Sequence, residues 1–168
     1  ANYMDYLIAD RTLIPEEKKH HYLEKIVYMP NSYQVNVSNR SVSRASLLRH
    51  DYGLPSKGFV FCCFNNTYKI TPSTFIGWMR ILKAVEGSVL WLFENNNSTT
   101  ENLKKEAVRF GINEDRFVFA THMPVEEHLN RIKQADLFID TLPYNAHTTA
   151  SDALRMGLPV LTCIGNSF

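Results

Sequence analysis

One stretch of the sequence decides the fold: Phe59-Val60-Phe61-Cys62-Cys63-Phe64-Asn65-Asn66-Thr67-Tyr68-Lys69-Ile70-Thr71-Pro72. Its first six residues are all apolar, which is typical of a central parallel strand covered on both faces. Thr71 is a favourable N-cap, and Pro72 then takes the first position of a helix. That helix has an apolar face at helical spacing, formed by Phe75, Ile76, Met79 and Leu82. The stretch therefore predicts a strand, a polar loop and a helix in direct succession.

The same alternation continues along the rest of the chain. Further strands are expected at 89–93, 117–119, 137–140 and 159–162. Helices are expected from about Thr100 to Gly111, from Val125 to about Gln134 and from near His147. Strict alternation of strands and helices predicts an α/β fold, a Rossmann-like parallel sheet with helices on both faces.

The residues before this region form a separate, smaller pattern. Short strands are expected at 6–9 and 26–29, with a polar helix from Pro15 to about Glu24 between them. Residues 31–57 are polar and rich in turn residues, which predicts a connection between two parts of the protein, with a short helix from Ser43 to Arg49.

Composition excludes several classes of protein. The 168 residues carry 18 basic and 17 acidic side chains, so no nucleic-acid or membrane partner is expected. Three cysteines, two of them adjacent, argue against a secreted disulfide framework and favour reduced thiols in the cytoplasm. The first residues are not expected to be a signal peptide, and no apolar run is long enough to span a bilayer. The chain begins almost directly in a strand, so we expect a piece of a longer protein.

The loop that runs into the last helix is the most informative for function. In open α/β sheets, ligands bind beyond the carboxyl ends of the strands. Here the loop ends at His147, Thr148 and Thr149, where free backbone N–H groups and the helix dipole favour an anion. Asp152 follows in the next turn, where a carboxylate suits a ribose diol. These residues predict a nucleotide diphosphate site without a metal, but residue chemistry alone leaves open that a threonine merely caps the helix and Asp152 complements its dipole.

Two other residues are candidates for the same site. Lys69 follows the most apolar strand, where a fixed cation would stabilise a leaving diphosphate. His128 lies where an imidazole would stack on a nucleobase. Taken singly, the alternatives are a surface lysine and a packing histidine.

No metal site is expected. Asp136 and Asp140 bracket one strand and are too far apart along it to form a metal pair. His20-His21 and Cys62-Cys63 lack the spacing of structural zinc ligands. The sequence also contains neither a G-x-G-x-x-G fingerprint nor a G-x-x-x-x-G-K-[ST] loop, which argues against a dinucleotide dehydrogenase and a P-loop kinase.

Taken together and in chain order, these segments resemble the O-linked N-acetylglucosamine transferase family. The residues from Phe64 to Thr74 resemble its donor-lysine segment, and 88–92 the strand that follows. Glu126-Glu127-His128 is similar to its nucleobase-contacting helix, and 145–149 with Asp152 to its diphosphate-and-ribose motif. Tyr3-Met4-Asp5-Tyr6 and Tyr28-Met29-Pro30 resemble the last elements of its first lobe.

The resemblance implies a two-lobed B-type glycosyltransferase built from two Rossmann-like halves. Residues 1–38 would end the first lobe, 39–57 would connect the lobes, and 58–168 would form the nucleotide-sugar-binding second lobe, truncated at its C-terminus. The implied reaction is metal-independent, inverting transfer of N-acetylglucosamine from UDP-N-acetylglucosamine to serine or threonine of a protein. Most of the first lobe and the helical tetratricopeptide repeats would lie outside this sequence, so we expect the isolated chain to turn over very slowly or not at all.

Carried over by position, the resemblance gives each candidate residue a role. Lys69 would stabilise the leaving diphosphate as the catalytic residue. His128 would stack on uracil, with Asn66 and Arg131 nearby. The implied phosphate and ribose contacts are His147, Thr148, Thr149 and Asp152. No cofactor other than the UDP-sugar donor is implied.

Two positions keep alternatives open within and outside this family. Val125 stands where well-known animal members carry a lysine near the nucleotide, and Tyr144 where they have cysteine near the sugar. A transferase that uses GDP-fucose or UDP-glucose on the same fold therefore remains an alternative. A second is a non-catalytic Rossmann-like module that binds a nucleotide.

Overall fold

The computed structural model describes residues 3–43, 45 and 47–165 and divides into two compact units. The first reaches Arg40 and includes Gly165, and the second runs from Ser41 to Ile164. No helix within the described part of the chain has the length and apolar character needed to cross a bilayer.

The first unit contains two parallel strands, β1 (Tyr6–Ala9) and β2 (Lys25–Tyr28). Both strands were predicted to within one residue. The polar helix expected from Pro15 to about Glu24 is a shorter 3-10 helix, η1 (Glu16–His21), none of whose residues is buried. Without an apolar face to pack, a longer helix has little to stabilise it. The carboxylate of Asp10 instead holds the preceding turn by accepting hydrogen bonds from the backbone N–H groups of Thr12 and Leu13.

The second unit is built around a five-stranded sheet in the order β5-β4-β3-β6-β7. Its strands are β3 (Val60–Cys63), β4 (Val89–Phe93), β5 (Phe117–Ala120), β6 (Leu137–Ile139) and β7 (Val160–Leu161). Every strand pairing is parallel. The predicted parallel α/β sheet is therefore confirmed.

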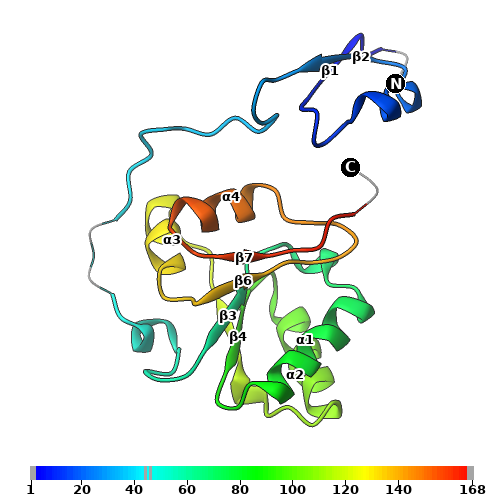
Figure 1. Cartoon of the computed structure of the whole chain (residues 1–168). Coiled ribbons are helices and arrows are strands. Elements are labelled where there is room, and N and C mark those ends of the chain that lie inside the picture. The colour runs from blue at the N-terminus through cyan, green and yellow to red at the C-terminus, as the bar shows by residue number, and fades with distance from the viewer. Residues whose placement is uncertain (1–2, 44, 46, 166–168) are drawn as a thin grey trace. The chain divides into compact units, whose positions relative to one another are not determined.

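Four α-helices connect these strands: α1 (Pro72–Ala84), α2 (Asn97–Arg109), α3 (Val125–Ile132) and α4 (Thr148–Arg155). From β3 the chain moves outward through β4 to β5, and then returns across the sheet to β6 and β7. Because such crossovers are right-handed, the reversal puts α1 and α2 on one face and α3 and α4 on the other, as Figure 1 shows. The strand order reverses between β3 and β6, and ligands bind at such a switch point.

Apolar strands explain why β3 and β4 lie at the centre. All four residues of β3 are buried, as are the first four of β4. Trp91 and Phe138 are fully enclosed, and α1 adds Phe75, Trp78, Met79 and Leu82 to the same core. Helix α1 begins where Thr71 and Pro72 predicted, with the Thr71 hydroxyl accepting from the Thr74 N–H group.

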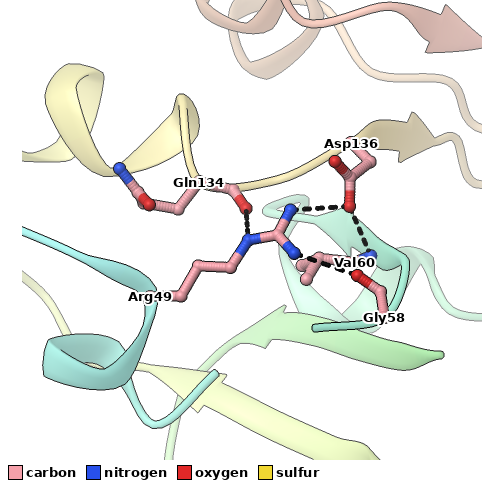
Figure 2. Close-up of polar contacts among 5 residues, drawn as sticks. All are labelled: Arg49, Gly58, Val60, Gln134 and Asp136. Atoms are coloured by element: carbon pink, nitrogen blue, oxygen red, sulfur yellow. Dashed lines mark hydrogen bonds and ion pairs between the residues drawn. The ribbon is translucent and has the colours of Figure 1, made fainter. Parts of the chain in front are cut away.

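The amino ends of β3 and β6 are joined by one ion pair. Arg49 contacts the carboxylate of Asp136 at 2.7 Å, and the same carboxylate oxygen accepts from the Val60 N–H group at 2.8 Å (Figure 2). Arg49 also donates to the carbonyl oxygens of Gln134 and Gly58, at 3.0 and 2.9 Å. The Arg49 cluster, defined as these five residues, therefore fixes the segment before β3 to the end of the sheet opposite the switch point.

Described residues between 41 and 47 contact α3. The Ser43 N–H group donates to the Glu126 carbonyl, and the Asn130 side chain donates to the Ala45 carbonyl. The helix expected from Ser43 to Arg49 includes residues 44 and 46, which lie outside the described residues. A 3-10 helix, η2 (Arg49–Tyr52), follows instead and ends at Gly53 in the left-handed conformation.

Candidate functional site

The switch point is occupied by a buried polar residue, Asn65, which follows β3 directly. Its side-chain amide donates to Asp140 at 3.1 Å and to the Thr141 hydroxyl at 2.8 Å, both just after β6. Its side-chain oxygen accepts a hydrogen bond from the hydroxyl of Thr149, in the first turn of α4. Asn65 therefore ties the carboxyl ends of β3 and β6 to the start of α4, and the residue is only 3% exposed.

The loop between β6 and α4, residues 141–147, is held on both sides. Asp140 accepts hydrogen bonds from the backbone N–H groups of Thr141 and Ala146 at 2.7 and 2.8 Å. On the other side, the Thr74 hydroxyl bonds both backbone groups of Leu142, at 2.9 and 3.2 Å. The loop thus has a fixed backbone without belonging to a helix or strand.

Lys69 lies against this loop. Its ammonium donates to the Asn145 carbonyl at 3.0 Å and lies 4.3 Å from the centre of the Tyr144 ring. The Tyr144 ring in turn stacks on the ring of His147, with centroids 5.8 Å apart. Burial lowers the pKa of Lys69, while the nearby charge of Asp140 raises it. The result is a partly buried cation at the mouth of the switch point.

Helix α4 presents its N-terminus at the same place. His147 is its N-cap, and the Ser151 N–H group donates to the His147 carbonyl at 3.0 Å. The N–H groups of the three residues before Ser151 have no acceptor within the helix, which makes this terminus a favourable anion site. Asp152 follows Thr148 by four positions and so lies on the same face of the helix.

A pocket of about 270 Å³ opens on the other side of β3, toward α3. Its lining combines aromatic, apolar and basic side chains, namely Phe64, Asn66, Phe93, His122, Met123, Val125, His128 and Arg131. Such a mixture of flat apolar surface and a few polar groups suits a planar heterocycle.

His128 and Arg131 form one unit in the wall of this pocket. Arg131 is 1% exposed and donates from Nε to His128 Nδ1 at 3.0 Å and from its terminal nitrogen to the Thr121 carbonyl at 2.6 Å. Its guanidinium also lies 5.3 Å from the centre of the Phe64 ring. Burial lowers the pKa of Arg131 to about 10, so it stays charged at neutral pH.

This pairing settles the protonation of the imidazole. Burial, with the charge of Arg131 as the second cause, lowers the pKa of His128 to about 4. The ring is therefore neutral near pH 7, and since Nδ1 accepts from Arg131, the proton sits on Nε2. His128 offers the pocket a neutral ring with one defined N–H donor.

The residues predicted from the sequence thus fall into two adjoining groups. Asn66, His128 and Arg131 line the pocket, while Lys69 and His147 meet at the loop through Tyr144. Thr149 does not cap α4, because its hydroxyl bonds Asn65. The two groups adjoin at Asn65 and Asn66, which are neighbours in the sequence.

Sequence reasoning missed the residues that hold the site together. Asn65 and Asp140 were not predicted as site residues, and Asp140 was considered only as a metal ligand. Asn145 was included in the 145–149 motif but given no role of its own. The available signal was position, because Asn65 and Asp140 are the first polar residues after the two strands that flank the switch point. Within the described residues, no three acidic, histidine or cysteine side chains come close enough to hold a metal ion together.

Comparison with known proteins agrees with this geometry. Residues 37–168 match the family described as Glycosyl transferase family 41. The chain belongs to this family. The resemblance found in the sequence is therefore confirmed.

Relatives within the family are named as N-acetylglucosaminyltransferases. The chain is 36% identical over 167 residues to a probable UDP-N-acetylglucosamine–peptide N-acetylglucosaminyltransferase, SEC, of Arabidopsis thaliana, covering 96% of this chain and 17% of the relative. It is 41% identical over 114 residues to the corresponding enzyme of Caenorhabditis elegans, covering 68% of this chain and 10% of the relative. The chain thus spans less than a fifth of the length of these relatives.

A solved structure has the same fold. A mutant O-GlcNAc transferase of Thermobaculum terrenum superposes with a TM-score of 0.79 at 29% identity, over 98% of this chain and 31% of that protein. The match places the five-stranded sheet and its helices in the fold of a family 41 glycosyltransferase.

Proposed function

We propose that this chain is the donor-binding part of a protein O-linked N-acetylglucosamine transferase, which transfers the sugar from UDP-N-acetylglucosamine to serine or threonine. The observation that carries the proposal is the meeting of a flat aromatic pocket, a partly buried lysine and an open helix N-terminus at one switch point. A nucleoside diphosphate has a planar base and two phosphates, and these three features match its parts in order.

The base is assigned to the pocket at α3. The neutral ring of His128 would stack on it or donate from Nε2, with Asn66 and Arg131 beside it. Val125, which is 52% exposed, gives this wall an apolar rather than a cationic residue. UDP is favoured over GDP because both relatives are named as transferases that use UDP-N-acetylglucosamine.

The diphosphate is assigned to Lys69 and α4. When the acceptor hydroxyl oxygen bonds the anomeric carbon, the bond from that carbon to the β-phosphate oxygen breaks, UDP leaves with the electron pair, and the hydroxyl proton is released. Lys69, His147, Thr148 and the first N–H groups of α4, that of Thr149 included, would stabilise that charge, and Asp152 would bind the ribose. These fixed donors support a reaction without a metal, and attack opposite to the leaving UDP would invert the anomeric centre.

The domain assignment follows from the same reasoning. Residues 1–38 would end the first lobe, 39–57 would connect the lobes, and 58–168 would be the donor-binding lobe. A protein acceptor would then be held against the donor by parts of the full-length protein outside this chain, because both substrates must be fixed together for transfer. The names of the relatives as peptide transferases support a protein acceptor.

The test is UDP binding to the 168-residue chain by calorimetry in the presence of EDTA. We expect metal-independent binding that Lys69→Ala weakens by about tenfold or more, or about 1.4 kcal/mol, because a hydrogen bond to a charged group is lost. Lys83→Ala, at an exposed position of α1, is the matched control and should leave the affinity unchanged.

GDP is the comparison ligand in the same experiment. Tighter binding of GDP than UDP would replace the proposed donor with a guanosine sugar. Absence of binding by either nucleotide to the folded chain would overturn the assignment of the site, as would equal weakening by both lysine changes.

A further inference from the structure

Asp140 bonds groups from several segments of the candidate site, and the proposed function gives it no role. Each of its carboxylate oxygens accepts several hydrogen bonds from groups on different segments. Oδ1 accepts from Asn65 Nδ2, Thr141 N and Ala146 N, and Oδ2 from Asn145 Nδ2 at 3.1 Å and Thr162 Oγ1 at 2.7 Å. The donors come from the ends of β3, β6 and β7 and from both ends of the loop, so one side chain joins all of them.

This carboxylate also sets the position of Lys69 through one intervening residue. The side chain of Asn145 is fixed by Asp140 and by the Thr141 carbonyl at 3.1 Å. The backbone carbonyl of the same Asn145 accepts from the Lys69 ammonium at 3.0 Å. A shift of the loop at Asn145 would therefore move the acceptor that orients Lys69.

The charge of Asp140 acts on Lys69 as well. The groups that face the ammonium are Asp140, the buried Cys63 thiol at the end of β3, and the Tyr144 ring with His147 behind it. Burial lowers the pKa of Lys69, and Asp140 opposes that effect without bonding the ammonium itself. The carboxylate thus favours the charged form of Lys69 but leaves its N–H donors to other acceptors.

We propose that Asp140 is the positioning residue of the nucleotide site, which fixes the 141–147 loop so that Lys69 is held in place for the diphosphate. The inference rests on the proposed function, since it concerns the same site. Asp140 itself touches neither the nucleotide nor the sugar in this assignment.

The experiment compares Asp140→Asn with two other variants of the 168-residue chain. Asp136→Asn is the matched control, because Asp136 precedes the same strand, accepts hydrogen bonds from Arg49 and Val60, and lies at the opposite edge of the sheet. Asn145→Ala removes the side-chain bond from Asn145 to Asp140 but keeps the charge of Asp140 and its bonds to the Thr141 and Ala146 N–H groups. UDP affinity is measured from about pH 7 to about pH 9, and each value is divided by that of the unmodified chain at the same pH, which cancels titration of the nucleotide.

The expected results separate geometry from charge. Asp140→Asn should weaken UDP binding by about tenfold near pH 7, and the loss should grow as the pH rises, because Lys69 loses its proton at a lower pH. Asn145→Ala should weaken binding by about threefold to tenfold with no dependence on pH. Asp136→Asn should stay within about twofold of the unmodified chain at every pH, once unfolding curves show that each variant is folded.

The outcomes also distinguish this inference from the proposed function. If the unmodified chain binds no UDP, the proposed function fails. If it binds UDP and Asp140→Asn binds within twofold of it at all pH values, the positioning role is wrong while the function stands. If Asp140→Asn and Asp136→Asn lost UDP affinity equally and at every pH, Asp140 would only support the fold. That result would also overturn the inference.

Discussion

The two ends of β6 carry the same residue type and use it differently. Asp136 precedes the three-residue strand and Asp140 follows it. Asp136 is paired directly with a cation, Arg49, at 2.7 Å. The hydrogen bonds that Asp140 accepts from the described residues come from neutral groups, and the nearby Lys69 bonds a carbonyl instead.

This difference separates a structural edge of the sheet from the edge at which we propose the nucleotide site. At the amino edge, charge is neutralised within the protein, so the Arg49 cluster gains stability and has no charge left for a ligand (Figure 2). At the carboxyl edge, the acid and the lysine are kept near each other but unpaired. That arrangement leaves Lys69 available to an anionic ligand at the cost of a weaker contribution to folding.

The largest expected effect is at the amino edge. Arg49→Ala should lower the free energy of unfolding by about 2 to 3 kcal/mol, because Asp136 and the carbonyl groups of Gln134 and Gly58 lose their donor. The pair is partly exposed, so the loss should be below that of a fully buried ion pair. Urea unfolding followed by circular dichroism measures it.

The comparison requires that this loss leave the nucleotide site intact. UDP affinity of folded Arg49→Ala should stay within about twofold of the unmodified chain. Arg80→Ala, at an exposed position of α1, is the control and should change neither quantity. A tenfold loss of UDP affinity in Arg49→Ala would show that the two edges are coupled and break the distinction.

The lowered pKa of His128 should make the folded protein less stable in acid. The folded pKa of His128 is about 4 and its unfolded value is near 6.5, so the unfolded chain binds an extra proton between these values. The stability is present above about pH 6.5 and is lost as the pH falls toward 4. Between about pH 7.5 and pH 5 this histidine should account for a loss of about 1 to 2 kcal/mol.

His128→Gln provides the comparison, because it removes the titration and keeps a polar side chain. Unfolding free energies of both proteins should be measured at the two pH values. The unmodified chain should lose more stability than His128→Gln over this interval. An equal loss in both would mean that His128 titrates normally in the folded protein.

The sheet could be predicted from the sequence because its signals are local. The apolar run before Asn65 and the Thr71-Pro72 start of α1 each depend on neighbouring residues, and they matched the structure closely. Element ends were less exact: α2 begins at Asn97 rather than near Thr100, because the Asn96 side chain caps it. The expected helix near Glu16 became a short 3-10 helix, since it has no buried face.

The site was only half accessible to the same reasoning. Lys69, His147 and Thr149 could be predicted as candidates because they lie at a strand end and a helix terminus. Asn65 and Asp140 were missed because they meet only when β3 and β6 are neighbours in the sheet. The two strands are far apart in the sequence, with 73 residues between Cys63 and Leu137. Strand order reverses at that pair, and alternation of strands and helices does not reveal where a reversal occurs.

The smallest expected effect comes from removing one hydroxyl group at the carboxyl edge, that of Thr149. Thr149→Val keeps the shape of the side chain but leaves the buried Asn65 oxygen without its hydroxyl donor. UDP affinity should fall by about threefold to tenfold, or about 1 kcal/mol, because Asn65 and the start of α4 lose their connection.

Thr100→Val is the matched control on α2, where the buried hydroxyl has no hydrogen-bond partner among the described residues. That change should leave UDP affinity unaltered and raise the free energy of unfolding by about 0.5 kcal/mol, since no bond is lost and a desolvated polar group is removed. Calorimetry measures the UDP affinity of each variant, and urea unfolding measures its free energy of unfolding. If Thr149→Val and Thr100→Val bound UDP equally well, the Thr149–Asn65 contact would only support the fold.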